Sequence, residues 1–346
     1  MNLKKIITIG SVVLISALLI YGFILARQIF SDNTKFSQKE LYVYVPTGSS
    51  YDEVKKIIEP FVANMDRFDL VAEKRSYPDN VKPGRFLFTK GMNSYELVKS
   101  LRLNVPVNLA FNNQERIENL AGRVGNQIEA DSLSLIKSFK DSIFLKENGF
   151  NEENILTLFI PNSYEIYWNT SAEKFRDKMI KEYRNFWNKD RIAKAAKQGL
   201  TPIEATILAS IVHKESVKKD ERPRIAGAYL NRMRLQMPLQ ADPTVIYAIK
   251  KNSNDFDQVI KRVFYKDLLI KSPYNTYVNL GLPPGPVAMP DITALDAVLN
   301  PEKNDYIYFC ASVTHFGYHE FAATFEEHTK NARKYSEWIS KQGVKR

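Results

Sequence analysis

The chain has 346 residues, of which 44% are hydrophobic and 25% charged, a composition typical of globular proteins and a length that allows more than one domain. Its net charge of +10 favours anionic surroundings, such as lipid headgroups or an acidic polymer. Nucleic acid is disfavoured as a partner, because the lysines are scattered and no nucleic-acid-binding motif is present. The single cysteine, Cys310, excludes an intrachain disulfide. The four histidines lack the spacing of a metal-binding motif, so we expect neither a metal nor another cofactor.

The amino terminus predicts a membrane anchor. Residues 6–25 contain no charged side chain, and a helix of this length can cross a hydrocarbon core of about 30 Å. Lys4 and Lys5 precede the run and favour a cytoplasmic amino terminus. A cleaved signal peptide is the alternative, but the run is long and no A-x-A site follows it. We therefore expect a cytoplasmic tail at 1–5, an anchor at 6–26 in the cytoplasmic (inner) membrane, and the rest of the chain outside the cytoplasm.

A small module follows the anchor. Residues 27–39 are polar and predict a short tether. The next segment, 40–104, contains two strand-like runs and two runs with apolar residues at helical spacing. Turn-forming residues separate them, which is typical of a small α/β module. The predicted elements are strands at 41–45 and 85–89 and helices at 51–59 and 94–101.

The remainder, residues 105–341, predicts one mixed domain. Strands and helices do not alternate regularly there, which favours an α+β architecture over a doubly wound parallel sheet. The predicted strands are 104–111, 159–167 and 306–311, and the predicted helices include 115–128, 130–147, 175–197 and 324–341.

A further helix in this domain carries a carboxyl group in an unusual place. Thr201 and Glu204 form a T-x-x-E capping box at its start. At about 100° per residue, Glu215 projects near Leu208 and Ile211 on the apolar stripe. Desolvation would raise the pKa of such a carboxyl group, as a general acid requires. The alternative is that Glu215, near the helix end, reaches water or pairs with a nearby lysine.

Other segments are rich in groups that suit a polar, ring-bearing ligand. Segment 228–232 places Asn231 and Arg232 at the polar edge of a predicted helix, and Asp242 precedes Pro243 as a predicted helix cap. Tyrosines beside Asn and Gln suit sugars, whose rings have apolar faces and hydroxyl rims. Each residue has a structural alternative: Asp242 can be only a cap, the tyrosines can be packing residues, and His319 can be either a structural histidine or a ligand contact.

The residues limit the chemistry that Glu215 could perform. A two-carboxylate hydrolase needs a second carboxylate about 5–9.5 Å away. Glu204 is too far, roughly 16 Å along the same helix, whereas Asp220, Glu221 and Asp242 stay possible. A serine triad lacks support because no G-x-S-x-G is present. The remaining option is one carboxyl group that acts first as acid and then as base, with the substrate supplying the nucleophile.

Four motifs resemble the MltG-type (YceG-like) endolytic murein transglycosylases. They are LASIVHKES, YLNRMRLQMPLQADPTVIYAI, SPYNTYVNLGLPPGPVAMP and FGYHEF with the EEH that follows. Together they cover roughly residues 155–335 in the order and spacing of that family. An amino-terminal anchor and a LysM-like subdomain, here at 40–104, also agree with the resemblance.

The resemblance implies a reaction and its site. Glu215 would protonate the glycosidic oxygen between N-acetylmuramic acid and N-acetylglucosamine in peptidoglycan and then deprotonate the muramyl 6-hydroxyl, which closes a 1,6-anhydro ring. The family cuts nascent strands beside the wall synthases (penicillin-binding proteins) and so limits strand length. The expected substrate contacts are Gln240, Asp242, Thr244, Tyr247, Asn275 and Tyr277 from the family's motifs, together with Asn231 and His319.

Two departures from the family pattern remain. Many members have an acidic residue where this chain has His213, which helical geometry places away from Glu215. Asn162 stands where the family has an acidic residue, which puts any charge-dependent role there in doubt. Two other functions also stay open: a scaffold that binds glycan without cutting it, and a muramidase that uses water as the nucleophile.

Overall fold

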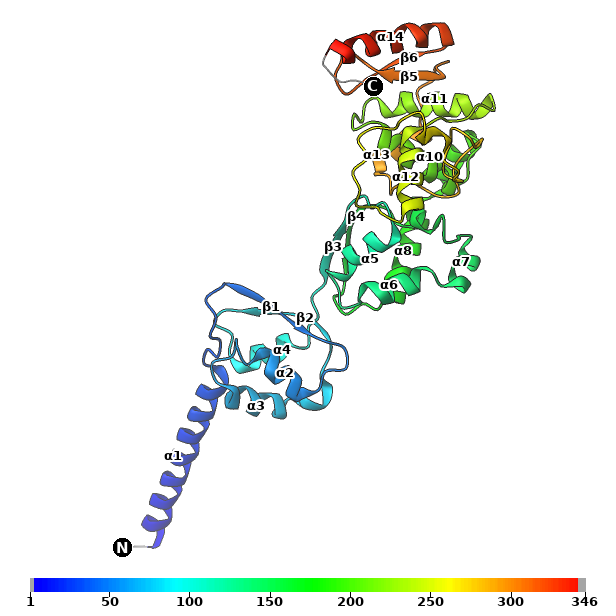
Figure 1. Cartoon of the computed structure of the whole chain (residues 1–346). Helices are drawn as coiled ribbons and strands as arrows, with labels where there is room; N and C mark the ends of the chain where they lie inside the picture. The colour runs from blue at the N-terminus through cyan, green and yellow to red at the C-terminus, as the bar shows by residue number, and fades with distance from the viewer. Residues whose placement is uncertain (1–2, 342–346) are drawn as a thin grey trace. The chain divides into compact units, whose positions relative to one another are not determined.

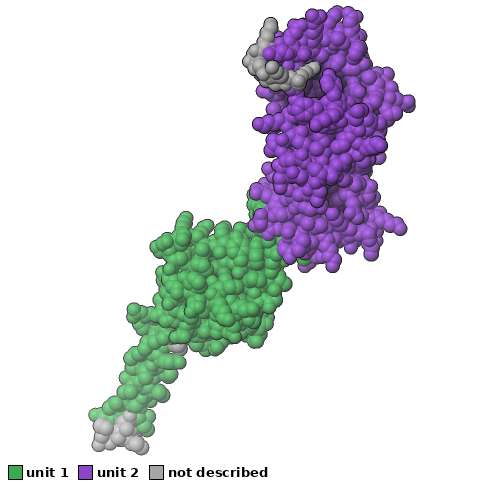
Figure 2. All heavy atoms as spheres, in the orientation of Figure 1, with its two compact units in different colours: residues 1–109, 127–130, 164–171 green, residues 110–126, 131–163, 172–346 purple. Residues whose placement is uncertain are grey.

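The computed structural model describes residues 3–341. Contacts divide the chain into two compact units, which Figure 2 shows in different colours. The first contains the described residues up to Leu109, together with the short segments 127–130 and 164–171. The second contains the rest. Helices and short two-stranded sheets make up both units, so the predicted α+β class is confirmed.

A long apolar helix, α1 (Leu3–Phe30), opens the chain. Its stretch Ile7–Phe30 has a mean hydropathy of 2.5, and by length and composition it could cross a membrane. A secretory signal sequence would have the same properties. The helix is longer than the predicted anchor and includes the first residues of the segment expected to be a tether.

Within the first unit, residues 40–104 form a small α/β module (Figure 1). β1 (Glu40–Val45) and β2 (Gly84–Thr89) pair antiparallel, and every second side chain points into the core. The module contains one helix that the sequence reading missed, α3, which Asn64 caps by accepting a hydrogen bond from the Arg67 amide at 2.9 Å. The likeness to LysM stays a prediction. The other elements are α2 (Tyr51–Ile58), α3 (Met65–Lys74), η1 (Pro78–Asn80) and α4 (Ser94–Ser100).

Two predicted helices of the second unit are each divided in two. Asp141 accepts a hydrogen bond from the Phe144 amide at 2.7 Å and caps a new helix inside the segment 130–147. Asn188 does the same for the Arg191 amide, at 3.0 Å. The elements as far as this point are β3 (Val107–Phe111), α5 (Ile117–Gly125), α6 (Ser132–Phe139), α7 (Ser142–Asn148), η2 (Ile155–Leu158), β4 (Asn162–Ile166), α8 (Ala172–Phe186) and α9 (Lys189–Lys197).

The core of the second unit surrounds α10 (Pro202–Glu215), which lies among α11, α12 and α13 in Figure 1. Every residue of α10 from Ala205 to Val212 is buried, so the helix is enclosed rather than striped. The amphipathic reading of this helix was therefore wrong, because neighbouring helices cover all its faces. The remaining elements are α11 (Arg222–Arg234), α12 (Asp242–Ser253), η3 (Asp267–Leu269), α13 (Ile292–Leu299), β5 (Tyr308–Ala311), β6 (His319–Ala322) and α14 (Phe325–Lys341).

Candidate functional site

Local sequence signals place Glu215 at the end of α10. The predicted capping box is present: the Glu204 amide donates to Thr201 Oγ1 at 3.2 Å, and the Thr201 amide donates to Glu204 Oε2 at 2.8 Å. The helix begins there and ends at Glu215. Because Glu215 belongs to the last turn, its side chain extends beyond the enclosed part of the helix.

Glu215 faces a cavity of about 500 Å³ within the second unit. Five predicted site residues line it, and the opposite wall is built from β5, β6 and α14. The cavity lining combines aromatic rings with a few polar side chains, as ligand-binding pockets generally do. The lining residues include Glu215, Gln240, Asp242, Tyr277 and His319, with Tyr229, Arg232, Leu239, Tyr308, Phe309, Phe325, His328 and Tyr335 among the others.

The environment of Glu215 tunes its acidity. Burial raises the pKa of the Glu215 carboxyl group to about 7. A hydrogen bond from the Tyr229 hydroxyl opposes this rise, as does the positive charge that His319 carries when its ring is protonated, whereas the negative charge of Asp242 adds to it. Near neutral pH a substantial fraction of Glu215 is therefore protonated, so that it can donate a proton.

Asp242 belongs to the cavity wall and does not cap α12. The helix begins at Asp242, and its cap position, Ala241, makes no side-chain cap hydrogen bond. The carboxylate instead accepts a hydrogen bond from the Tyr277 hydroxyl at 2.7 Å. The prediction of a capping role was wrong, because Asp242 is the first residue of the helix and its carboxylate pairs with Tyr277.

Arg232 is a buried residue in the lining of the cavity. It is 7% exposed, although the sequence suggested the polar edge of a helix. Its guanidinium donates to the Leu239 carbonyl at 2.6 Å and to Gln240 Oε1 at 3.0 Å. It also lies 5.4 Å from the ring centre of Tyr308. Arg232 thus orients Gln240 at the edge of the site.

A buried carboxylate holds His319 at the start of β6. The His319 amide donates to Glu221 Oε1 at 2.6 Å, and the ring Nδ1 lies 3.0 Å from Glu221 Oε2. Glu221 is 4% exposed. Of the two interpretations of His319, the structure shows a ring that is anchored on one side and borders the cavity on the other.

Two predicted contacts from the family motifs lie within the protein. Thr244 is fully buried, and its hydroxyl bonds to the Ala241 carbonyl at 2.7 Å and to Thr276 Oγ1 at 2.8 Å. Asn275 is also fully buried and donates to two backbone carbonyls at 2.9 Å each. Both side chains hold loops behind the cavity in place.

Asn231 and Tyr247 also lie outside the cavity lining. Asn231 donates to the backbone carbonyls of Asn304 at 2.8 Å and Tyr306 at 2.9 Å, which fixes the chain that leads into β5. Tyr247 packs against Tyr274, with ring centres 4.6 Å apart, and lines a separate cavity. The structure thus brings five of the nine candidates together and places the other four in the supporting framework.

A larger hollow of about 850 Å³ adjoins the Glu215 cavity. The two share Asp242, Tyr277 and Tyr335 in their walls. The larger one continues along the loop before η3, past the cationic Lys261 and the exposed ring of Tyr265. Together they provide room for a ligand much longer than one sugar.

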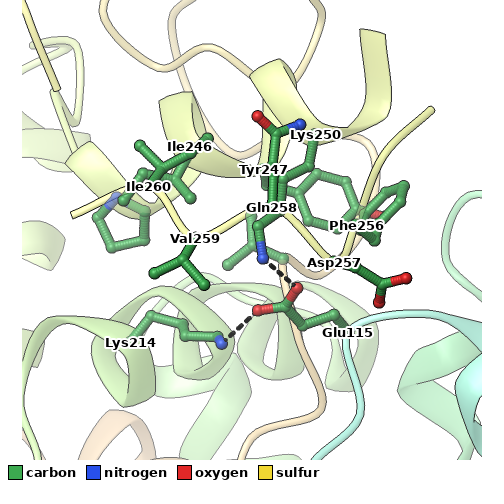
Figure 3. A pocket seen from close by; sticks show the side chains of 12 residues that line it. Glu115, Lys214, Ile246, Tyr247, Lys250, Phe256, Asp257, Gln258, Val259 and Ile260 are labelled. Carbon is green, nitrogen blue, oxygen red and sulfur yellow. Dashed lines mark hydrogen bonds and ion pairs between the residues drawn. The ribbon is translucent and has the colours of Figure 1, made fainter. Parts of the chain in front are cut away.

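Figure 3 shows the separate cavity, of about 320 Å³, on the side of α10 that carries Lys214. At its base Glu115 accepts hydrogen bonds from Lys214 Nζ at 2.7 Å and Lys250 Nζ at 2.8 Å. Burial favours a higher pKa for Glu115, but the two ammonium groups hold it below its ordinary value. The cluster ties the segment before α5 to α10 and α12.

A buried arginine fixes the chain immediately after Glu215. Arg222 is 3% exposed, and its Nε donates to the Ser216 carbonyl at 3.0 Å. Its Nη1 contacts both carboxylate oxygens of Asp291 at 2.7 and 2.8 Å. Burial acts to raise the pKa of Asp291, but hydrogen bonds from His213 and Arg222 hold it well below its usual range. His213 thus belongs to this cluster, and it is not among the residues that line the Glu215 cavity.

Sequence reasoning missed several residues of the site. Tyr229 was part of a recognised segment, but no local signal relates it to Glu215, because the two lie on different helices. β6 was not predicted as a strand, and the stacking of Tyr308 on His328, with ring centres 5.1 Å apart, is a tertiary contact. Among the residues that the structure describes, no group of His, Cys, Asp and Glu side chains could hold a metal ion.

Comparisons with known proteins place this site in context. A sequence profile of the YceG-like family matches residues 43–334. The chain is 26% identical over 340 residues to an endolytic murein transglycosylase of Bacillus subtilis, a match that covers 91% of this chain and 90% of the relative. It is 27% identical to the protein of the same name from Streptococcus pneumoniae, over 86% of this chain and 59% of the relative. A crystal structure of a putative YceG-like protein from Listeria monocytogenes is similar at 28% identity and a TM-score of 0.56, over 85% of this chain and 99% of that one.

Proposed function

The chain belongs to the YceG-like family, and we propose that it is an endolytic murein transglycosylase that cuts peptidoglycan strands internally. The bond cleaved is the β-1,4 bond between N-acetylmuramic acid and N-acetylglucosamine, and the product ends in 1,6-anhydro-N-acetylmuramic acid. The names of its relatives support the general activity. The observation that carries the proposal for this chain is a carboxyl group with a pKa of about 7 that faces a cavity bordered by aromatic and polar side chains.

Glu215 is the general acid in this reaction. In its protonated form it donates to the glycosidic oxygen, which leaves as the 4-hydroxyl of N-acetylglucosamine. The muramyl 6-hydroxyl attacks C1 and closes the anhydro ring, so no water is consumed. In the simplest scheme the proton of that hydroxyl goes to the carboxylate that Glu215 has become. Participation by the 2-acetamido group would remove the need for a second carboxylate.

The substrate contacts follow from the walls of the cavity. Gln240, Asp242 and Tyr277 present polar groups beside Glu215, and Arg232 and Tyr277 hold two of them in fixed orientations. Aromatic rings on β5 and α14 offer flat apolar faces for sugar rings. The adjoining hollow accommodates further units of the strand on one side of the cleaved bond.

A muramidase that uses water is the second candidate function. Asp242 supports it, because this carboxylate borders the same cavity and its charge raises the pKa of Glu215. It could act as a base toward water, as the second carboxylate does in inverting glycosidases. Such an enzyme would release reducing ends in place of anhydro ends. A scaffold that only binds glycan would release neither.

We place the catalytic unit outside the cytoplasmic membrane. A retained α1 would hold the chain in that membrane with its amino terminus in the cytoplasm, where Lys4 and Lys5 favour it. Nascent strands are made at this surface, so the penicillin-binding synthases are the partners implied by the family. A LysM-like role for residues 40–104 belongs to the same proposal.

The experiment is product analysis on purified, uncrosslinked glycan. Wild type is compared with Glu215→Gln, and mass spectrometry distinguishes anhydro from reducing ends. Glu165→Gln, at an exposed position on β4, is the matched control. We expect anhydro ends from wild type and control, and a loss of at least about 100-fold in Glu215→Gln. Full activity of Glu215→Gln would refute the assignment, and reducing ends from wild type would select the muramidase.

A further inference from the structure

A histidine, His319, lies in the wall of the Glu215 cavity. His319 stands opposite Ala311 in the β5–β6 ladder, and Glu221 holds both its amide and its ring, at 2.6 and 3.0 Å. The ring also packs edge-on against Phe309, with centres 5.3 Å apart and planes at 78°. Backbone, carboxylate and aromatic contacts together fix the plane of the imidazole.

The partner of the ring determines where its proton lies. Burial acts to raise the pKa of Glu221, but its hydrogen bonds with His319 hold it below the ordinary value, so Glu221 is a carboxylate. A carboxylate can only accept, and Nδ1 of His319 must therefore carry the hydrogen. In the neutral ring Nε2 then has a free lone pair. Within the described chain no hydrogen bond engages Nε2, and the residue borders the cavity.

We propose that His319 is a catalytic base of this site and that Glu221 is its positioning residue. The inference rests on the proposed function and deepens it. Glu215 gives its proton to the glycosidic oxygen as the bond from that oxygen to C1 breaks. The muramyl 6-oxygen forms the new bond to C1, and its proton passes to Nε2 of His319. Transfer of a proton from the imidazolium to the Glu215 carboxylate then restores both groups, and no external reactant is needed.

Two groups on different elements suit this reaction better than one. A single carboxylate would have to serve the leaving oxygen and the attacking hydroxyl in turn, although these sit at different places around C1. With Glu215 at the end of α10 and His319 at the start of β6, each proton transfer has its own group. The buried pairing of a carboxylate with Nδ1 is the arrangement that orients the catalytic histidine of serine proteases.

The decisive variant is Glu221→Gln, which is nearly isosteric. The His319 amide still needs an acceptor, so the side-chain oxygen of Gln stays on that side and its NH₂ group faces Nδ1. Nδ1 must then accept, which moves the ring hydrogen to Nε2 and blocks the lone pair. Nitrogen NMR of the histidine-labelled, full-length chain in detergent reads the tautomer directly, and a His319→Gln sample assigns the signal among the four histidines.

Activity is measured on wild type, Glu221→Gln, His319→Ala and Glu215→Gln, with circular dichroism as the check on folding. We expect the Nδ1–H tautomer in wild type and the Nε2–H tautomer in Glu221→Gln. In that variant and in His319→Ala, kcat should fall by about 100- to 10,000-fold with little change in KM. Added imidazole should restore part of the activity of His319→Ala and none of that of Glu215→Gln.

The outcomes separate this inference from the proposed function. Near wild-type kcat in His319→Ala, or in Glu221→Gln with the switched tautomer, overturns the role of His319 while the transglycosylase assignment stands. A fall in activity that appears only in KM also overturns it, because it reveals a binding contact. A wild-type enzyme that cuts no glycan overturns both proposals.

Discussion

The hydroxyl of Tyr229 donates a hydrogen bond of 2.5 Å to Oε1 of Glu215. Tyr229 is itself buried on α11, and its pKa is raised well above the ordinary value, first by burial and then by the neighbouring carboxylate. It therefore stays a neutral donor throughout the accessible pH range. A carboxylate that accepts such a bond is stabilised, so Tyr229 limits how far burial can raise the pKa of Glu215.

We predict that activity falls as pH rises through about 7, because the reaction needs protonated Glu215. In Tyr229→Phe the bond that lowers this pKa is lost, so the alkaline midpoint should move upward. The measurement is kcat/KM against pH on uncrosslinked glycan. Tyr183→Phe is a control, since this half-buried tyrosine lies outside the cavity lining. A midpoint that stays in place in Tyr229→Phe would contradict the assignment.

Asp242 acts on the same pKa in the opposite direction. Its negative charge raises the pKa of Glu215, so Asp242→Asn should move the alkaline midpoint downward while Tyr277 keeps a side-chain oxygen to donate to. For a transglycosylase we expect anhydro ends to persist at reduced rate. If Asp242 were the base of a muramidase, the variant would lose its products altogether, which product analysis would show.

We also predict that the Glu215 carboxyl group destabilises the folded protein at high pH. Its folded-state pKa of about 7 exceeds that of an unfolded Glu, near 4.3, so stability decreases as pH rises between these values and levels off above them. Glu215→Gln removes this effect. Thermal unfolding should show the variant stabilised by roughly 1–3 kcal/mol at about pH 8 and by much less at about pH 4.5. Equal effects at both pH values would mean that the carboxyl group is not desolvated.

The features that the sequence predicted correctly are those that local signals, such as helix caps, determine. The capping box of Thr201 and Glu204 placed the start of α10, and the position of Glu215 followed from helix length. The caps at Asp141 and Asn188 were equally local but were not used, and two helices were therefore drawn too long. In each case the information lay within three residues of the cap.

The wall opposite Glu215 could not be predicted, because it depends on tertiary contacts. The bond between His319 and Glu221 joins residues that are 98 positions apart. The family motifs gave a list of residues but not their orientation. Thr244 bonds to Thr276 behind the site, whereas Asp242, two residues earlier, lines the cavity. About half a turn of helix separates the two residues, and it decides which of them can meet a ligand.

The contacts that buried Arg222 makes with Ser216 and Asp291, just after Glu215, give a further prediction about stability. Arg222→Met leaves the Asp291 carboxylate without its principal partner and frees the Ser216 carbonyl, so we expect a loss of about 3 kcal/mol. Arg224→Met on the same helix is the control, because its pair with Glu302 is exposed and should contribute less than about 1 kcal/mol. Denaturant unfolding measures both. Similar losses in the two variants would show that the buried contacts of Arg222 stabilise the fold no more than an exposed ion pair does.

Gly285, in the proline–glycine loop after Tyr277, tests whether this motif is shaped by packing. A Cβ atom there would lie 1.9 Å from the Glu153 carbonyl oxygen and 2.8 Å from the Tyr274 hydroxyl, so either the loop or its neighbours must move. Overpacking of this kind costs about 1–3 kcal/mol, and we expect Gly285→Ala to lose at least that much in denaturant unfolding. Gly122→Ala is the control, because nothing lies within 4 Å of a Cβ added to that helical glycine; alanine should be neutral or stabilising there. An unchanged stability of Gly285→Ala would mean that the loop is free to shift, and the close backbone approach would then not explain the glycine.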